Sequence, residues 1–566
     1  MTGRRHLPVR PRSLMRALGA KGGGNARGDL LGALTAWALI VPECVAYAQI
    51  AGVPPQNAFY AAPVALVAYV LVGRSRFLII GATSAAAVLS GATVSDLSSD
   101  PKRAVGLSAA LAVIAGGVLL AAGVARLGFV TNFLAEPALN GFLFGMALTI
   151  VVRQLAKIVD TSSGDGQFFP RLWTVLRHVA DWSLPSLAVG VAALAALFAL
   201  ERWVPRLPAS LVVLIAAVAV SAAAGLEDHG VAVVGKIPSA VPVPHLPGIP
   251  AADWWRLAGG ACGVALVVFA EAFSIASRFA REHGDEVRAD REMAAVGIAN
   301  ICVGLFRGFT VSGSASRSAA AEAAGARSRL TSLIAAVLIL VTGAFLTPLF
   351  TELPEPVLGA IVIVAVRGFL SPAQLRRYAR ADRASLWVAL TALAGVLLFD
   401  LLPGLLLAVA LSLVLFVAAA STAHLAVLGK LPASPLWGDT AQHPDATSVP
   451  GVLVTRPDGA LFFGNADRTR KGVLALTASA HPAPHTVVLD LSATYHLGVP
   501  VLDTLGELRE SLERRGAALH LARLHEAARH DFDRHRLAGL LGPDAVHADV
   551  GDAVRALTGP SRPRQE

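Results

Sequence analysis

Long apolar stretches separated by short polar ones dominate the first three quarters of the chain. A helix needs about 20 apolar residues to cross a bilayer, at about 1.5 Å of rise per residue. Stretches that approach this length recur between residues 30 and 422 and predict thirteen or fourteen membrane-spanning segments. We prefer the even number because it places both ends of the chain on the same side of the membrane.

Two segments in this region are too short and too rich in small residues to be ordinary spans. They cover residues 81–91, GATSAAAVLSG, and residues 313–325, GSASRSAAAEAAG. Each follows a helix with a lone carboxylate, Glu43 in VPECVAYA and Glu271 in VFAEAFSIAS. Interrupted helices at corresponding positions of two halves are typical of transporters whose binding site lies at the membrane midplane. Chance likeness among small residues is the other explanation.

The second short segment carries an arginine, Arg317, between stretches apolar enough to lie in a bilayer. An unpaired arginine in hydrocarbon is costly, so such a residue normally faces a cavity or a partner. Two interpretations stay open: Arg317 attracts an anion, or it forms a structural pair with Glu322, one helical turn further on. A helix that begins inside the membrane also directs free N–H groups and its positive dipole end at what precedes it, which suits an anion.

The two lone carboxylates, Glu43 and Glu271, lie in apolar helices. Burial disfavours the ionised form, so protonation near neutral pH is expected. Either residue can then carry a coupled proton or help to hold a sodium ion. The alternative is that each one, when protonated, simply donates a hydrogen bond to a neighbouring helix.

Composition and charge agree with a membrane protein. The 566 residues are 55% hydrophobic and only 15% charged, with a mean hydropathy of +0.61, whereas soluble domains carry roughly 25% charged residues. The net charge of +9 arises from arginines at the ends of apolar segments, such as Arg74 and Arg76. This pattern follows the positive-inside rule, places the amino terminus in the cytoplasm and argues against nucleic-acid binding. The three cysteines form no CxxC pair and indicate neither a disulfide framework nor a metal site.

The last part of the chain changes character. From residue 451, the stretches VLVT, ALFF, TVVLDLS and AALHLA read as strands that alternate with helices, which predicts a small cytoplasmic α/β domain. The predicted organisation is therefore a basic cytoplasmic tail (1–28), an all-α polytopic membrane domain (29–422), a linker (423–450), the α/β domain (451–558) and a disordered tail (559–566).

Two stretches resemble one family of transporters. DLLGALTAWALIVPECVAYAQIAGVPPQNAFYAA (29–62) and FAEAFSIASRFAREHGDEVRADREMAAVGIANICVGLFRGFTVSGSASRSAAAEAAGARSRL (269–330) are similar to the sulfate permease (SulP) family. The α/β domain resembles the sulfate transporter and anti-sigma-factor antagonist (STAS) domain of that family. The resemblance implies about fourteen segments in a 7+7 inverted repeat, with a core of segments 1–4 and 8–11, a gate of segments 5–7 and 12–14, and a homodimer.

The resemblance also implies a site in which two half-helices face each other and bracket the anion with their amino ends. On this chain the expected anion-binding residues are Ala82, Thr83, Ser84, Ser314, Ala315, Ser316 and Arg317. The hydroxyls of Ser314 and Ser316 can instead bond to their own helix, so the backbone N–H groups are the safer expectation. Glu43 and Glu271 are the expected ion-coupling residues, and no cofactor or metal is expected.

The STAS-like domain departs from its family pattern in one place. The resemblance leads us to expect an acidic residue and then a phosphorylatable hydroxyl after the central strand, where this chain has Gly498 and Pro500. A phospho-switch at this point is therefore in doubt.

The leading hypothesis is a secondary active transporter in the cell membrane. It would carry a small anion, sulfate foremost and bicarbonate, chloride or a dicarboxylate otherwise, by elevator-type alternating access, coupled to H⁺ or Na⁺ or by exchange. A nucleobase permease of the same architecture is one alternative, although Arg317 and the STAS-like domain argue against it. A non-transporting membrane sensor or scaffold that acts through the STAS-like domain is another. An enzyme is not expected, since the sequence shows no nucleophile with its base and no nucleotide-binding loop.

Overall fold

The chain divides into two compact units, with the boundary between Ser412 and Leu413. The computed structural model describes residues 26–95, 97–98, 100–129, 136–162, 164, 167–204, 207–238, 243–399, 401–422 and 424–558. Most of the predicted amino-terminal tail and the whole of the predicted tail 559–566 lie outside these ranges. Residues 26–28, predicted as the end of the first tail, already belong to the first helix.

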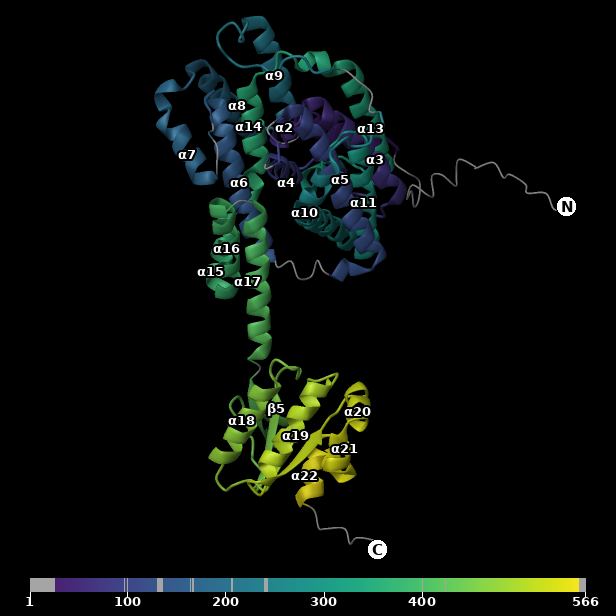
Figure 1. Cartoon of the computed structure of the whole chain (residues 1–566), viewed down its shortest axis with the longest axis vertical. Coiled ribbons are helices and arrows are strands. Elements are labelled where there is room, and N and C mark those ends of the chain that lie inside the picture. The colour runs from purple at the N-terminus through teal and green to yellow at the C-terminus, as the bar shows by residue number, and fades with distance from the viewer. Residues whose placement is uncertain are drawn as a thin grey trace, which may run out of the picture. The chain divides into compact units, whose positions relative to one another are not determined.

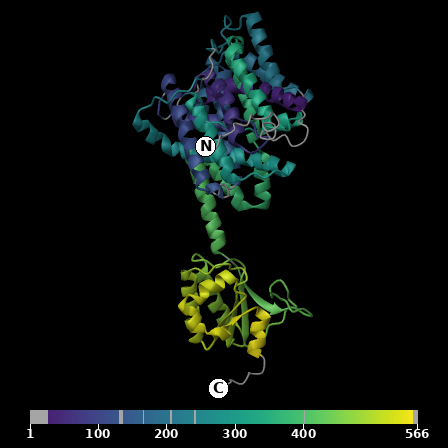
Figure 2. The same cartoon turned by 90° about the vertical axis from the view of Figure 1, so that its right-hand side faces the viewer.

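The first unit is a bundle of helices (Figure 1, Figure 2). Among the described residues up to 421, eight helices are long and apolar enough to cross a membrane. Four further apolar helices in this part are shorter. The number of membrane crossings stays a prediction. The helices are α2 (Ala26–Ile50), α3 (Pro55–Val72), α4 (Ser84–Ser95), α5 (Pro101–Val124), α6 (Glu136–Ile158), α7 (Phe168–Arg177), α8 (Leu184–Trp203), α9 (Ala209–Ala224), α10 (Ala251–His283), α11 (Ala289–Leu305), α12 (Ala315–Ala323), α13 (Leu330–Val341), α14 (Glu355–Val366), α15 (Pro372–Ala381), α16 (Arg383–Phe399) and α17 (Leu401–Ser421).

Helix packing in this unit follows the predicted division into core and gate. Helices α2 to α5 pack with α10 to α13, whereas α6 packs on α14 and α16, and α8 on α9 and α14. Figure 1 shows α3, α5, α10, α11 and α13 gathered together, and α6, α7 and α8 beside one another. The core contacts are reciprocal: α2 touches α12 and α13, and α10 touches α4 and α5. This exchange of partners is what an inverted repeat requires.

The two predicted short segments are short helices, each preceded by a two-residue strand. Strand β1 (Ile80–Gly81) leads into α4, and strand β2 (Ser312–Gly313) leads into α12. The strands pair antiparallel, with Ile80 opposite Gly313 and Gly81 opposite Ser312. This pairing holds the amino ends of α4 and α12 close to each other.

Buried polar side chains fix the segments that lead into both short helices. Glu292 on α11 accepts hydrogen bonds from the backbone N–H of Arg74 and Ser75 (3.0 and 3.3 Å) and from the hydroxyl of Tyr69 (2.6 Å). Asn300, also on α11, accepts from the N–H of Val311 at 2.9 Å and donates to its carbonyl at 3.0 Å. One helix therefore anchors the approach to α4 and the approach to α12.

The second unit is an α/β fold with a six-stranded sheet in the order β4-β3-β5-β6-β7-β8. Strands β5 to β8 are parallel, and β3 runs antiparallel to β4 and β5. The elements are β3 (Leu425–Lys430), β4 (Trp437–Asp439), β5 (Val452–Pro457), α18 (Ala466–Ser479), β6 (Thr486–Asp490), α19 (Val499–Glu513), β7 (Ala518–Ala522), α20 (Glu526–Asp533), α21 (Arg536–Leu541), β8 (Val546–His547) and α22 (Val550–Thr558).

The sheet separates two apolar cores. Buried apolar side chains of α18, α19, α20 and α21 cover one face, and α22 covers part of the other. Helix α19 begins after Gly498 with Pro500 in its first turn, as the sequence predicts for a helix start.

Two predictions for this unit differ from the structure. Residues 423–450, predicted as a linker, contribute strands β3 and β4 to the sheet. The stretch ALFF (460–463), predicted as a strand, is not one. Two of its backbone N–H groups donate to side chains instead of to a neighbouring strand: Leu461 donates to Thr494 Oγ1 at 3.0 Å and Phe462 to Asn465 Oδ1 at 2.9 Å.

Candidate functional site

Arg317 lies in the first turn of α12 and is the bulkiest of the fully buried side chains in the described structure, with 1% of its surface exposed. Its Nη2 atom donates a 2.6 Å hydrogen bond to the carbonyl of Ala82, directly before α4. Its Nη1 and Nε atoms are buried and have no hydrogen-bond partner among the described residues. A guanidinium with two unused donors is poised to bind an acceptor.

Glu43 of α2 supplies the counter-charge to this arginine. Its Oε2 atom lies 3.4 Å from Nε of Arg317, an ion pair, but with no hydrogen bond between the two groups. The alternative partner from the sequence, Glu322, instead has its Oε1 atom 2.9 Å from Nε2 of His283. Arg317 thus forms an ion pair with Glu43, a residue of the other half of the chain, and this pair leaves Nη1 of Arg317 available to another acceptor.

Glu271 of α10 faces the start of the other short helix. Its Oε2 atom accepts a 3.1 Å hydrogen bond from the hydroxyl of Thr83. The same hydroxyl oxygen accepts from the N–H of Ala86 at 3.3 Å, so Thr83 caps α4 while it holds the carboxylate. The carboxylate of the second half therefore bonds to the first half, just as Glu43 of the first half contacts Arg317 of the second.

The amino end of α12 is partly open. Ser314 caps the helix by accepting from the N–H of Arg317 at 3.4 Å, and its hydroxyl lies 3.1 Å from that of Ser316. Ala315 and Ser316 are exposed, whereas Ser314 is buried. Since first-turn N–H groups have no acceptor within their own helix, those of Ala315 and Ser316 can bind an anion, and the Ser314 hydroxyl is mainly a cap.

The amino end of α4 is more enclosed. Ala82, Thr83 and Ser84 are all buried. Gly81 of β1 is a glycine because of Arg317: a Cβ atom there would lie 2.6 Å from Nη1. The structure therefore brings the nine predicted residues together, with Arg317 between the amino ends of α4 and α12.

A cavity of about 450 Å³ opens beside this site, between α2, α4 and α6. Helices α2 and α4 contribute residues both to this cavity and to the site, but the residues that line the cavity are not those of the site. Three cations line it, Arg153, Lys157 and Arg171. Lys157 Nζ lies 2.9 Å from Gln49 Oε1 and 3.8 Å from Glu355 Oε2. These three cations were not among the residues expected for the site, although a basic residue inside an apolar span is itself a functional signal.

Comparison with known proteins decides the family. A model of the sulfate permease family matches residues 27–392, and a model of the STAS domain matches residues 443–553. The chain belongs to the sulfate permease family. A probable sulfate transporter of Mycobacterium tuberculosis is 35% identical over 532 residues, which cover 94% of this chain and 95% of that protein. High affinity sulfate transporter 2 of Stylosanthes hamata is 28% identical, over 94% of this chain and 84% of the plant protein.

Solved structures share the fold of this sulfate permease family member. The murine Solute Carrier 26 family member A9 anion transporter, in its inward-facing state, superposes with a TM-score of 0.88 at 21% identity, over 98% of this chain and 97% of that one. The transmembrane domain of the cyanobacterial bicarbonate transporter BicA superposes with a TM-score of 0.61 at 20% identity, over 68% of this chain. The protein is a multi-pass membrane protein with a carboxy-terminal STAS domain, and its coarse functional class is anion transport.

Proposed function

We propose that this chain is a secondary active transporter of small oxyanions, sulfate foremost, and that the anion binds between the amino ends of α4 and α12 beside Arg317. The observation that carries the proposal is the buried guanidinium of Arg317, whose Nη1 has no hydrogen-bond partner among the described residues. A buried donor without a partner costs roughly 1–3 kcal/mol, and more when charged. A bound anion removes that cost.

The charges around the site favour an anion over a neutral nucleobase. Arg317 and two helix amino ends supply positive potential, and the Glu43 carboxylate offsets it only in part, at 3.4 Å from Nε. A tetrahedral oxyanion has enough acceptor oxygens to engage Nη1 and the free first-turn N–H groups of α12 together. Its charge then neutralises the core, which lowers the cost of moving the core past the apolar gate.

Glu271 and Glu43 would couple this movement to a cation gradient, H⁺ or Na⁺. Glu271 bonds to Thr83 at the amino end of α4, and Glu43 contacts Arg317. Each carboxylate therefore connects one repeat with the other repeat's half of the anion site. Binding of a cation at either carboxylate reduces its competition with the anion for positive charge, which is a means of coupling. The expected working form is a homodimer that carries its anion by elevator-type movement of core against gate.

The test is uptake of radiolabelled sulfate into proteoliposomes under imposed proton and sodium gradients, one at a time, with bicarbonate, chloride, dicarboxylates and uracil as competitors. We expect uptake in the wild type and in Arg380→Ala, an exposed arginine of α15, and its loss in Arg317→Ala and Glu271→Gln. The size-exclusion profile of each variant, compared with that of the wild type, is the check that the variant is folded. Wild-type rates in both site variants would sink the proposed site, and competition by uracil alone would favour the nucleobase alternative.

A further inference from the structure

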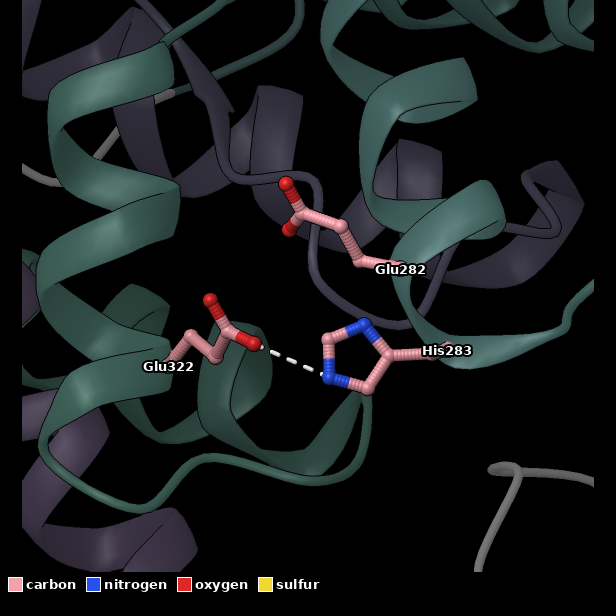
Figure 3. Close-up of side chains that lie close together, drawn as sticks. All are labelled: Glu282, His283 and Glu322. Atoms are coloured by element: carbon pink, nitrogen blue, oxygen red, sulfur yellow. Dashed lines mark ion pairs between the residues drawn. The ribbon is translucent and has the colours of Figure 1, made fainter.

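A second cluster of polar side chains lies at the opposite end of α12 from Arg317. Glu282 and His283 end α10, and Glu322 lies in the last turn of α12. One ligand atom from each of the three side chains lies within 4.8 Å of the other two. Figure 3 shows the two carboxylates and the imidazole ring directed into the space between the two helices. The proposed transport mechanism makes no use of these residues.

The His283 ring and the Glu322 carboxylate are close enough to share a proton or a metal ion. Nδ1 lies 3.0 Å from the carbonyl oxygen of Phe279, which can only accept, so Nδ1 carries a hydrogen. In the neutral ring Nε2 then presents a lone pair, and it faces Oε1 of Glu322 at 2.9 Å. Two acceptors at that distance repel each other unless a proton or a metal ion lies between them. A ring N–H held by a backbone carbonyl is also the usual outer contact of a metal-binding histidine.

The surroundings hold the ring in place. The Phe77 ring packs on it, with centroids 4.1 Å apart. Arg76 and Asp285, on either side of this contact, form an ion pair at 2.7 Å. The side chains of His283, Glu322 and Glu282 are 24%, 26% and 44% exposed, so an ion can reach them from solvent. The cluster is therefore both pre-organised and accessible.

We propose that Glu282, His283 and Glu322 form a binding site for a divalent transition-metal ion of the zinc class. An imidazole ligand favours zinc and its neighbours over magnesium or calcium, which prefer oxygen ligands alone. Two carboxylates and one imidazole satisfy three positions of a tetrahedral ion and leave one for water. Arg278 Nε bonds to one oxygen of Glu282 at 2.9 Å, which leaves the second oxygen of that carboxylate for the metal.

A bound metal ion would join the two helices that carry the transport site. Helix α12 carries Arg317 in its first turn, and α10 carries Glu271. The ion would fix the far end of α12 to the end of α10, and so stabilise the core against unfolding in proportion to its occupancy. This site is separate from the anion site, and its existence does not depend on which anion is carried.

The experiment is a zinc titration of the full-length, tag-free protein in detergent, stripped with a chelator and competed against a zinc-sensitive dye. We expect the wild type to bind one Zn²⁺ more than His283→Gln. Glu282→Gln and Glu322→Gln should each weaken this site at least about 10-fold, the lower end of the loss from an altered outer-shell partner. Glu286→Gln, an exposed carboxylate in the adjoining loop, is the matched control and should bind as the wild type does.

Two further measurements keep the proposal open to refutation. The melting temperature should rise with Zn²⁺ in the wild type and in Glu286→Gln but less in His283→Gln, and the zinc absorption edge should show imidazole and carboxylate ligands. Equal zinc stoichiometry and affinity in the wild type and His283→Gln would overturn the site, and so would a purely thiolate edge. Equal competition by Mg²⁺ would overturn its zinc-class assignment. If His283 and Glu322 form only an ion pair, the wild type and His283→Gln should bind zinc equally. Sulfate uptake tests the anion site independently of this outcome.

Discussion

Nε of Arg317 lies 3.4 Å from Oε2 of Glu43, close enough for charge attraction but without a hydrogen bond. The two residues come from α12 and α2, in different halves of the chain. Glu43 thus lowers the cost of burying the guanidinium while it competes with an anion for the same charge. If the anion binds beside Arg317 as proposed, Glu43 is an internal counter-ion that the anion must displace in part.

Replacement of Glu43 by glutamine should strengthen anion binding and weaken the fold. The loss of the competing charge is expected to lower the KM for sulfate by about 5-fold, a typical small coupling between sites. The melting temperature should fall because one partner of a buried pair is removed. Uptake kinetics measure the KM, and thermal unfolding of the same preparation measures the melting temperature. A higher KM would show that Glu43 supports the anion instead of competing with it.

Thr83→Val should uncouple transport from the driving ion. It keeps the shape of the side chain but removes the hydroxyl that donates to Glu271 and caps α4. We expect gradient-driven uptake to fall at least about 5-fold, while equilibrium exchange of labelled sulfate falls less. Thr93→Val, further along α4, is the matched control and should keep the full response to the gradient. An equal loss of both activities would indicate damage to the anion site.

Gly81→Ala should displace Arg317. The new methyl group would lie 2.6 Å from Nη1, and the buried guanidinium has little space in which to move. Sulfate uptake is expected to fall at least about 10-fold, equivalent to ~1.4 kcal/mol of binding. At Gly117 of α5 an added Cβ meets no atom within 4 Å, so Gly117→Ala provides the control. Full activity in Gly81→Ala would mean that Arg317 tolerates another position.

Lys157→Gln should slow the arrival of anions without changing the site itself. Lys157 lines the cationic cavity next to α2 and α4, and such a cavity raises the local anion concentration in a salt-dependent way. The KM for sulfate should rise at low ionic strength, and the difference should shrink at high ionic strength; kcat should stay near the wild-type value. Arg177→Gln, an exposed cation of α7 outside the cavity, should behave as the wild type. A change in kcat alone would contradict a steering role.

The STAS domain should become less stable in mild acid around His520 and His547. Nδ1 of His520 lies 2.9 Å from Nε2 of His547. Burial and, secondarily, the neighbouring His547 lower the pKa of His520, and burial lowers the pKa of His547. The unfolded state therefore binds more protons, so stability is complete above about pH 6.5 and decreases as the pH falls below it.

Hydrogen exchange of β7 and β8 in the full-length protein, corrected for intrinsic rates, can measure this effect. Protection should stay constant above about pH 6.5 and decrease from there down to the lowered folded-state pKa values. His547→Gln should flatten the dependence, whereas His530→Gln, which replaces an exposed residue, should not. Protection in the wild type that is independent of pH would show that the pair does not control local stability.

The sequence was enough to single out the residues of the candidate site, because charged residues and runs of small residues are unusual in apolar segments. Arg317, Glu43 and Glu271 are isolated charges in apolar segments, and the short helices are visible as runs of small residues. The pairings were not predictable, because they join residues far apart in the chain. Thus Glu322 was the expected alternative partner of Arg317, whereas the structure pairs it with His283.

The differences in the second unit have a local cause. LAVLGK (425–430) is a strand of six residues that lies shortly after the end of α17 at Ser421, and it was predicted as part of the linker 423–450. ALFF (460–463) has the composition of a strand, but no neighbouring strand bonds to it, and Thr494 and Asn465 take its N–H groups. Short apolar runs do not carry enough periodicity to separate these cases.

The pairing of β1 with β2 also has a consequence for how the protein is made. Ala82 and Arg317, joined by a hydrogen bond beside this pairing, lie 235 residues apart in the chain. During synthesis the first half must therefore wait in the membrane with the end of β1 unpaired until the second half arrives. A chain that ends before β2 therefore lacks both the strand that pairs with β1 and the guanidinium that donates to the carbonyl of Ala82.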